Sequence, residues 1–180
     1  MNGTEFRSAF AEHKDAIYRF AWRMTNSPTA AEDVVQEAFL ALLRHPGRFD
    51  VRRGQLRSFL LGVARNVALK RWREENRWDA FDDNPSAEQL AADPVDLTRA
   101  EAAQLVGDAV RALPPLQREV LVLAQYEGLS LEEIARMVEA EVGTVKARLH
   151  RARENLKRAL APLRPANGRN LISNGTPERS

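Results

Sequence analysis

The chain of 180 residues contains no cysteine, which excludes disulfides, thiol nucleophiles, cysteine-ligated zinc and iron–sulfur clusters. Its three histidines are widely spaced, so we expect no metal site and no cofactor. No apolar run approaches the roughly 18 residues that a membrane span requires, and no signal-peptide pattern follows the N-terminus. We therefore expect a protein without membrane insertion that acts in the cytoplasm.

Charge is nearly balanced overall, at +2, but it is distributed unevenly along the chain. Residues 1–78 hold 14 Lys and Arg against 9 Asp and Glu, and residues 109–164 hold 10 against 7. The segment between them, 79–108, holds one Arg against eight acids. Two basic blocks on either side of an acidic one suggest two modules that touch a polyanion, joined by a segment that does not. Ordinary solvated faces would give a similar distribution, so charge alone leaves both readings open.

Apolar residues recur at intervals of three and four, with no sustained alternation of period two, which predicts an all-α protein. The expected helices span 5–25, 29–44, 56–78, 97–113, 116–126, 130–138 and 143–160. Thr29 with Glu32, and Ser130 with Glu133, fit the capping box that begins a helix. In the fourth helix we expect an inner stripe that includes Ala100.

The helices group into two small domains. Acidic and proline-broken sequence predicts a flexible linker over 79–99, between a first domain at 1–78 and a second at 100–163. The last residues, 164–180, contain Gly and Pro without apolar periodicity, so we expect a disordered tail.

Residues 130–156 predict a helix-turn-helix: a short capped helix, a turn, and a longer helix with one narrow apolar stripe. The second helix of such a motif enters the DNA major groove. Two polar stripes flank the side opposite the apolar stripe. They consist of Thr144, Arg148 and Arg151, and of Lys146, His150 and Arg153. Arginine there can bridge guanine acceptors or hold phosphates, although a helical hairpin with a solvated basic face would show the same pattern.

Four stretches of the chain together resemble the extracytoplasmic-function sigma factors, the two-domain sigma subunits of bacterial RNA polymerase. Residues 31–40 (AEDVVQEAFL) are similar to the core-binding helix of that family, and 59–68 to its promoter-melting helix. Residues 113–120 (LPPLQREV) and 142–153 (VGTVKARLHRAR) are similar to its C-terminal DNA-binding domain. The resemblance covers residues 6–162 in the expected order. It implies an all-α fold with sigma region 2 at 1–78 and sigma region 4 at 100–163.

The resemblance also implies partners. A member of this family binds core RNA polymerase and promoter DNA, and some members are held inactive by an anti-sigma factor, which we also expect for this chain. Region 2 reads the −10 element while the strands open, and region 4 reads the −35 element. Such a sigma factor has no catalytic chemistry of its own.

Site residues follow from placing the family's functions on this sequence. The core-binding face comprises Asp33, Gln36, Glu37 and Leu40, a polar patch with an apolar edge. The residues that we expect to bind the −10 element are Arg52, Arg53, Asn66, Lys70, Arg71 and Arg73. We expect the two polar stripes of residues 144–153 to bind the −35 element. Trp72 and Trp78 either stack on unpaired bases or close the core.

The sequence departs from the family pattern at three positions. Phe59 stands where Trp is usual, and Gly62 where Arg is frequent, so one DNA contact is missing. Glu139 occupies the turn position that usually carries Gly. A left-handed backbone there costs a residue with a side chain about 1 kcal/mol.

One other function class stays open at this stage, a free-standing helix-turn-helix regulator with a helical sensor or dimerisation domain. A regulator has no reason to pair a core-binding helix with a melting helix rich in Arg and aromatics. An enzyme has almost no support, because neither a phosphate loop nor a compelling Ser/His/Asp set is present.

Overall fold

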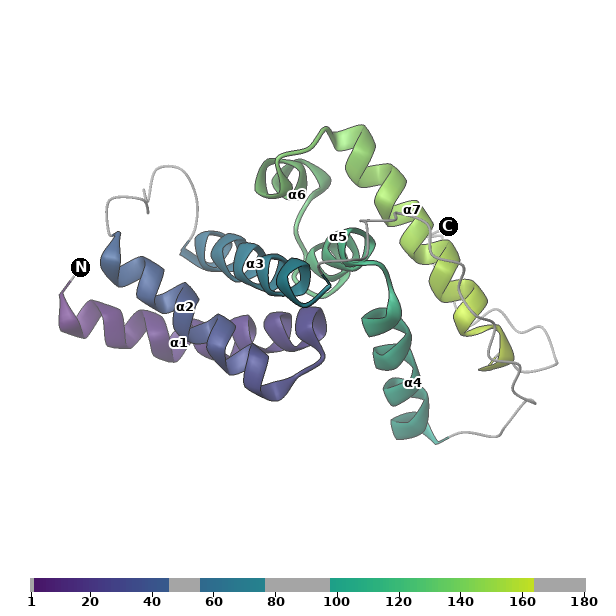
Figure 1. Ribbon diagram of the computed structural model, residues 1–180, viewed down its shortest axis with the longest axis horizontal. Helices are drawn as coiled ribbons and strands as arrows, with labels where there is room; N and C mark the ends of the chain where they lie inside the picture. Colours follow the sequence, from purple (N-terminus) through teal and green to yellow (C-terminus); the bar gives the residue numbers. More distant parts are fainter. Residues whose placement is uncertain (1, 46–55, 77–97, 164–180) are drawn as a thin grey trace, which may run out of the picture.

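The structure, a computed structural model, describes residues 2–45, 56–76 and 98–163, and within these ranges every regular element is helical. Helices α1 (Gly3–Thr25), α2 (Pro28–Arg44) and α3 (Leu56–Glu75) pack together as an N-terminal bundle. Helices α4 (Arg99–Ala112), α5 (Pro115–Gln125), α6 (Leu131–Val138) and α7 (Val142–Ala159) form a C-terminal bundle, and a short 3₁₀ helix, Ala161–Leu163, follows α7. The two bundles lie side by side, with α5 and α6 next to α3 (Figure 1). The all-α prediction is confirmed.

Local capping explains where several helices begin. The Ser130 hydroxyl accepts a hydrogen bond from the Glu133 N–H while the Glu133 carboxylate accepts one from the Ser130 N–H, so the predicted capping box of α6 is confirmed. The predicted box at Thr29 and Glu32 is wrong. Helix α2 begins at Pro28 instead. Ser27 caps it, because the Ser27 hydroxyl accepts a hydrogen bond from the Ala30 N–H, and Pro28 fits the first helical position.

At the turn between α6 and α7 the sequence left two alternatives, a different turn geometry or a strained backbone, and the structure has the strained backbone. Glu139 caps α6 with a φ of 54°, in the left-handed region. Its backbone N–H donates to the Ala135 carbonyl. The chain therefore keeps the ordinary helix-turn-helix geometry and accepts the cost of a side chain at this position.

The N-terminal bundle encloses a core to which all three of its helices contribute. Ile17 and Phe20 of α1, Val34 of α2, and Leu60 and Leu61 of α3 are completely buried. Burial of one such side chain contributes about 1.5–3 kcal/mol to folding. This core fixes the orientation of the helices, and thereby decides which faces of α2 and α3 remain outside.

The C-terminal bundle packs around α5. Val120 and Leu123 of α5, Ile134 of α6 and Val145 of α7 are completely buried, and the Asn155 amide of α7 donates to the Gln117 side chain of α5 at 2.7 Å. Helix α4 contributes only its C-terminal end. Its expected inner residue Ala100 is exposed, because the first half of α4 does not pack against the rest of the bundle.

Candidate nucleic-acid interface

The face of α2 opposite its buried stripe carries the predicted core-binding residues. Gln36 and Glu37 are exposed, and Asp33 and Leu40 are half-buried. The Asp33 carboxylate accepts a hydrogen bond from Nη2 of Arg71 at 2.6 Å, across the contact between α2 and α3. The sequence placed these two residues in different interfaces. The structure joins them, so the polar face of α2 continues onto the basic end of α3.

Helix α3 carries the described part of the predicted −10 site. Asn66, Lys70 and Arg73 are exposed, and Arg71 is half-buried. The Asn66 side-chain oxygen accepts from Nη1 of Arg65 at 3.0 Å, which fixes the orientation of this amide. The other two predicted residues, Arg52 and Arg53, lie outside the described residues, as does Trp78.

A mostly apolar hollow of about 270 Å³ lies between α2 and α3 beside these residues. Phe59, Val63 and Val67 supply apolar surface, while Asn66 and Lys70 supply an amide and an ammonium group. His45, the residue that follows the end of α2, also lines it. Such a hollow can take up a flat unstacked ring, because it offers apolar contact together with hydrogen-bonding groups.

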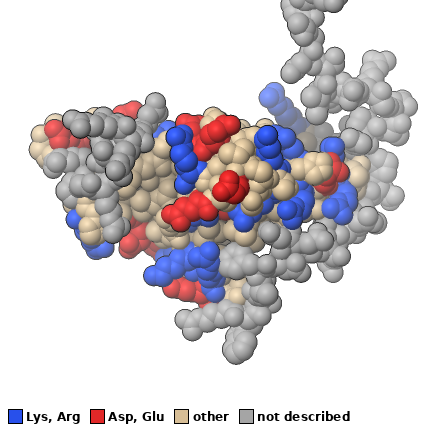
Figure 2. Space-filling view, turned by 90° about the horizontal axis from the view of Figure 1, so that it is seen from above, with Lys and Arg blue, Asp and Glu red and all other residues tan. Residues whose placement is uncertain are grey.

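Helix α7 presents five of its six predicted residues to the outside. The exposed ones are Thr144, Lys146, His150, Arg151 and Arg153. Figure 2 shows Lys and Arg side chains gathered over the part of the molecule where α7 runs. Cations along the outer face of a recognition helix suit phosphate and guanine contacts.

Arg148 departs from the expected outward position. Its side chain is 17% exposed, and Nη1 lies 4.0 Å from the Glu119 carboxylate of α5. Its Nε is buried and has no hydrogen-bond partner within the described part of the chain. The helical spacing placed Arg148 in one stripe with Thr144 and Arg151, but it points inward because buried Glu119 attracts its charge.

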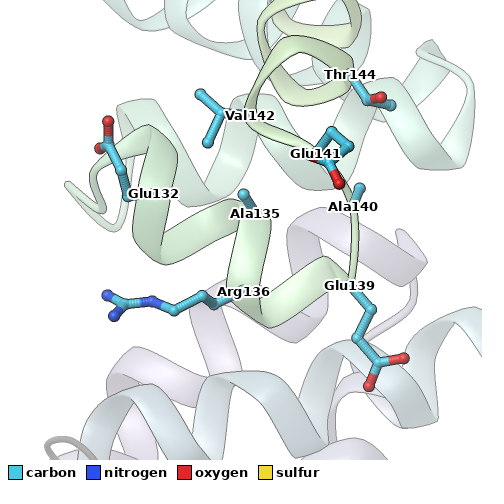
Figure 3. Close-up of a pocket in the computed structure, with 8 residues that line it drawn as sticks. All are labelled: Glu132, Ala135, Arg136, Glu139, Ala140, Glu141, Val142 and Thr144. Atoms are coloured by element: carbon cyan, nitrogen blue, oxygen red, sulfur yellow. The ribbon is translucent and has the colours of Figure 1, made fainter.

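The turn of the helix-turn-helix is acidic, a feature that we had not singled out as functional in the sequence. A hollow of about 660 Å³ lies between α6 and the start of α7, with Ala135 and Val142 at its centre (Figure 3). Three carboxylates, Glu132, Glu139 and Glu141, line it together with one cation, Arg136, so its lining is acidic on balance. Carboxylates repel phosphate groups, so DNA backbone contacts fall more favourably on the basic residues farther along α7.

Arginines also connect the two bundles, which no local pattern in the sequence indicates. Nη1 of Arg118, on α5, donates to the Met24 carbonyl at the end of α1, and Nη2 donates to the Leu113 carbonyl. Burial and the neighbouring Arg111 cation lower the pKa of Arg118 to about 10. Arg118 therefore remains charged at neutral pH, with carbonyl oxygens in place of an acidic partner.

Within the described ranges, no helix is long and apolar enough to cross a membrane. Nor does any group of three or more Asp, Glu or His side chains in those ranges come together in a way that would hold a metal ion.

Two family matches cover most of the chain. Sigma-70 region 2 matches residues 9–78, and sigma-70 region 4 matches residues 96–156. The region 2 match removes the alternative of a free-standing regulator, since α1–α3 then form a sigma domain and not a sensor.

Individual relatives agree with these matches. The ECF RNA polymerase sigma factor SigW of Bacillus subtilis is 33% identical, over 87% of this chain and 91% of its own. SigL of Mycobacterium tuberculosis is 33% identical, over 87% and 89%. Among solved structures, the sigma factor RpoE in complex with the anti-sigma factor NepR, from Bartonella quintana, superposes with a TM-score of 0.69 and 26% identity, over 89% and 99%. CnrH in complex with the cytosolic domain of CnrY superposes with a TM-score of 0.64 and is 25% identical, over 89% of this chain and 90% of its own. The chain therefore belongs to the extracytoplasmic-function (ECF) RNA polymerase sigma factors, which are transcription initiation factors.

Proposed function

We propose that this sigma factor docks on core RNA polymerase through the outer face of α2. Gln36 and Glu37 are exposed there, beside half-buried Leu40, and such a patch suits a basic helical partner. Asp33 contributes through its ion pair with Arg71, which holds the base of the patch in place.

The −10 element, in this proposal, is read by α3 and the hollow beside it. A base extruded from the opened strand enters between Phe59 and Val67, and Asn66 and Lys70 meet its polar edge. Arg71 and Arg73 follow the backbone of the strand, together with Arg52 and Arg53, which lie outside the described residues. Trp72 is half-buried, so we assign it to packing and not to base stacking.

We propose that the −35 element is read by α7. Lys146, His150 and Arg151 face outward along the helix, with Thr144 at its start and Arg153 farther along. Arg148 joins them only after its contact with Glu119 is released. The exposed basic face of α7 is the observation that carries this assignment.

We propose a division into region 2 at 1–78, an acidic linker at 79–99, region 4 at 100–163 and a tail at 164–180. The family matches at 9–78 and 96–156 support it. The protein acts in the cytoplasm, has no catalytic activity of its own, and is controlled by an anti-sigma factor. A solved relative, the sigma factor RpoE in complex with the anti-sigma factor NepR, supports the last point.

In vitro transcription with purified core polymerase on genomic DNA, with mapping of start sites, tests the proposal. Arg151→Ala should reduce transcription from the mapped promoters at least tenfold, whereas Lys157→Ala, on an exposed position of the same helix, should leave it unchanged. Equal transcription by both variants would remove α7 from promoter reading.

Docking on core polymerase has its own test. Gln36→Ala combined with Glu37→Gln should weaken the affinity for core polymerase, measured by fluorescence anisotropy of labelled sigma factor. Glu12→Gln, an exposed carboxylate on α1, is the matched control. If the double variant binds as tightly as the control, the α2 face is not the docking site.

A further inference from the structure

The side of α3 that faces the C-terminal bundle carries two arginines, and each is paired with a carboxylate of that bundle. Nη2 of Arg57 lies 2.5 Å from Oε2 of Glu127, and Nη1 donates to the Glu127 backbone carbonyl. Arg65 donates to both carboxylate oxygens of Glu119, at 2.6 Å from Nε and 3.2 Å from Nη2. Bidentate pairs of this kind are strong and geometrically specific.

Glu119 connects the two helices that we assign to DNA reading. Its side chain is completely buried, and it contacts Arg65 of α3 on one side and Arg148 of α7 on the other. A buried carboxylate is stable only with its cations in place, because removal of one partner leaves an uncompensated charge. Glu119 therefore favours a state in which α3 and α7 are held together.

The end of α1 makes a second zone of contact with the C-terminal bundle. The Arg111 guanidinium lies 4.3 Å from the ring centroid of Trp22, and that of Arg23 lies 4.1 Å from the ring centroid of Tyr126. With the hydrogen bond from Arg118 to the Met24 carbonyl, these contacts involve cations from both bundles. The packing of the bundles thus rests on several directed interactions at separate places.

Gly62 of α3 faces Met137 of α6. A Cβ atom added at Gly62 would lie 3.8 Å from Cγ of Met137. A long side chain at this position would need the space that Met137 occupies. The resemblance predicts Arg at this position in many relatives, so the glycine both removes a cation and permits the close approach.

We propose that the α3 face formed by Arg57, Gly62 and Arg65 is a docking surface for the C-terminal bundle of the same chain, and that docking keeps the free sigma factor from reading promoters. The inference rests on the proposed function of α3 and α7. Elements at −10 and −35 are about 25 base pairs apart, or roughly 85 Å of B-DNA. Helices that share one carboxylate cannot reach both, so the bundles separate before a promoter is read.

Docking also makes several arginines unavailable for binding DNA. Arg57 and Arg65 are paired with carboxylates and are therefore not free to contact phosphates, and Arg148 is largely buried against Glu119. Binding to polymerase releases the docked state if the polymerase holds the two bundles apart.

The absence of cysteine allows a direct test with the full chain. In the variant Gly62→Cys with Met137→Cys, the docked state places the two cysteines opposite each other, because a Cβ atom at position 62 lies 3.8 Å from Cγ of Met137, the atom that a cysteine sulfur would replace. We expect a mild oxidant to form the intramolecular disulfide in high yield in the free protein. The oxidised protein should lose at least tenfold in promoter-specific transcription, and dithiothreitol should restore it. Each single cysteine variant, treated with the same oxidant, serves as the control and should stay active.

Two results would overturn the proposal: no disulfide in the free protein, or equal transcription by the oxidised and reduced forms. Disulfide yield is measured without polymerase or DNA, so it tests docking alone. Transcription by the unmodified chain tests the proposed function alone, and the two failures are therefore distinguishable.

Discussion

Replacement of Arg65 by Met should open the docked state, because it removes the cation nearest to a buried carboxylate while keeping most of the side-chain volume. Arg65 is 13% exposed on its side chain, and Glu119 is completely buried. In the variant, Glu119 retains only Arg148, at 4.0 Å. The bundles must then either bury a poorly compensated charge or separate and let water reach it.

The structure sets the size of the effect. Breaking a buried ion pair by removal of one partner costs about 3–5 kcal/mol when the charge stays buried. Separation of the bundles limits this cost, because the Glu119 carboxylate then becomes hydrated. We therefore expect the docked state to lose about 2 kcal/mol, which corresponds to a roughly 30-fold lower ratio of docked to separated molecules.

Resonance energy transfer between two labels can measure this ratio. Lys14→Cys on α1 and Lys157→Cys on α7 are exposed positions for the labels, and no native cysteine competes. Transfer efficiency should fall in the Arg65→Met variant, while circular dichroism stays unchanged because each bundle keeps its own core.

Arg71→Met is the matched control. Arg71 lies on the same helix and pairs with Asp33 at the same 2.6 Å, but both ends of that pair belong to the N-terminal bundle and both are partly exposed. Its loss should cost at most about 1 kcal/mol and leave the transfer efficiency unchanged. Equal efficiency in Arg65→Met and Arg71→Met would refute the argument that Glu119 holds the bundles together.

Three further predictions concern stability. Glu139→Gly should stabilise the C-terminal bundle by about 1 kcal/mol in urea unfolding, because Glu139 has a φ of 54°, and an unchanged midpoint would contradict this. Phe20→Ala should destabilise the N-terminal bundle by about 3–5 kcal/mol, since Phe20 is completely buried, and a loss below 1 kcal/mol would disprove its central place in the core. Hydrogen bonds from Ser130 lower the pKa of Glu133 below its ordinary 4.5, so its carboxylate contributes stability above about pH 4.5 that is lost as the pH falls through the lowered value. The stability difference between the wild type and Glu133→Gln should therefore shrink on acidification below pH 4.5, and a constant difference in pH-dependent unfolding would exclude this linkage.

Features that depend on residues close together in the chain could be predicted from the sequence alone. Helical periodicity and the Ser130–Glu133 capping box placed α6, and the stripe that begins at Val145 placed the buried side of α7. Contacts three and four residues apart are set by the helix itself, so they can be read before the fold is known. At Glu139 the sequence was compatible with a different turn geometry or with a strained one, and the positive φ is known only from the structure.

Even local rules were ambiguous where two signals competed. Thr29 and Glu32 offered a capping box, but the Ser27 cap followed by Pro28 begins α2 instead. Proline is well suited to the first helical position, and the helix extends to the first cap that satisfies its free N–H groups.

The way the two bundles meet could not be predicted from the sequence. Arg65 and Glu119 are 54 positions apart in the chain, and Arg57 and Glu127 are 70 apart. No periodicity relates residues at such distances, and each of these side chains could equally have been solvated. Burial makes the difference, because a carboxylate removed from water requires a cation, and packing alone determines which arginines are within reach. For the same reason, helical spacing put Arg148 on the outer face of α7, while Glu119 draws it inward.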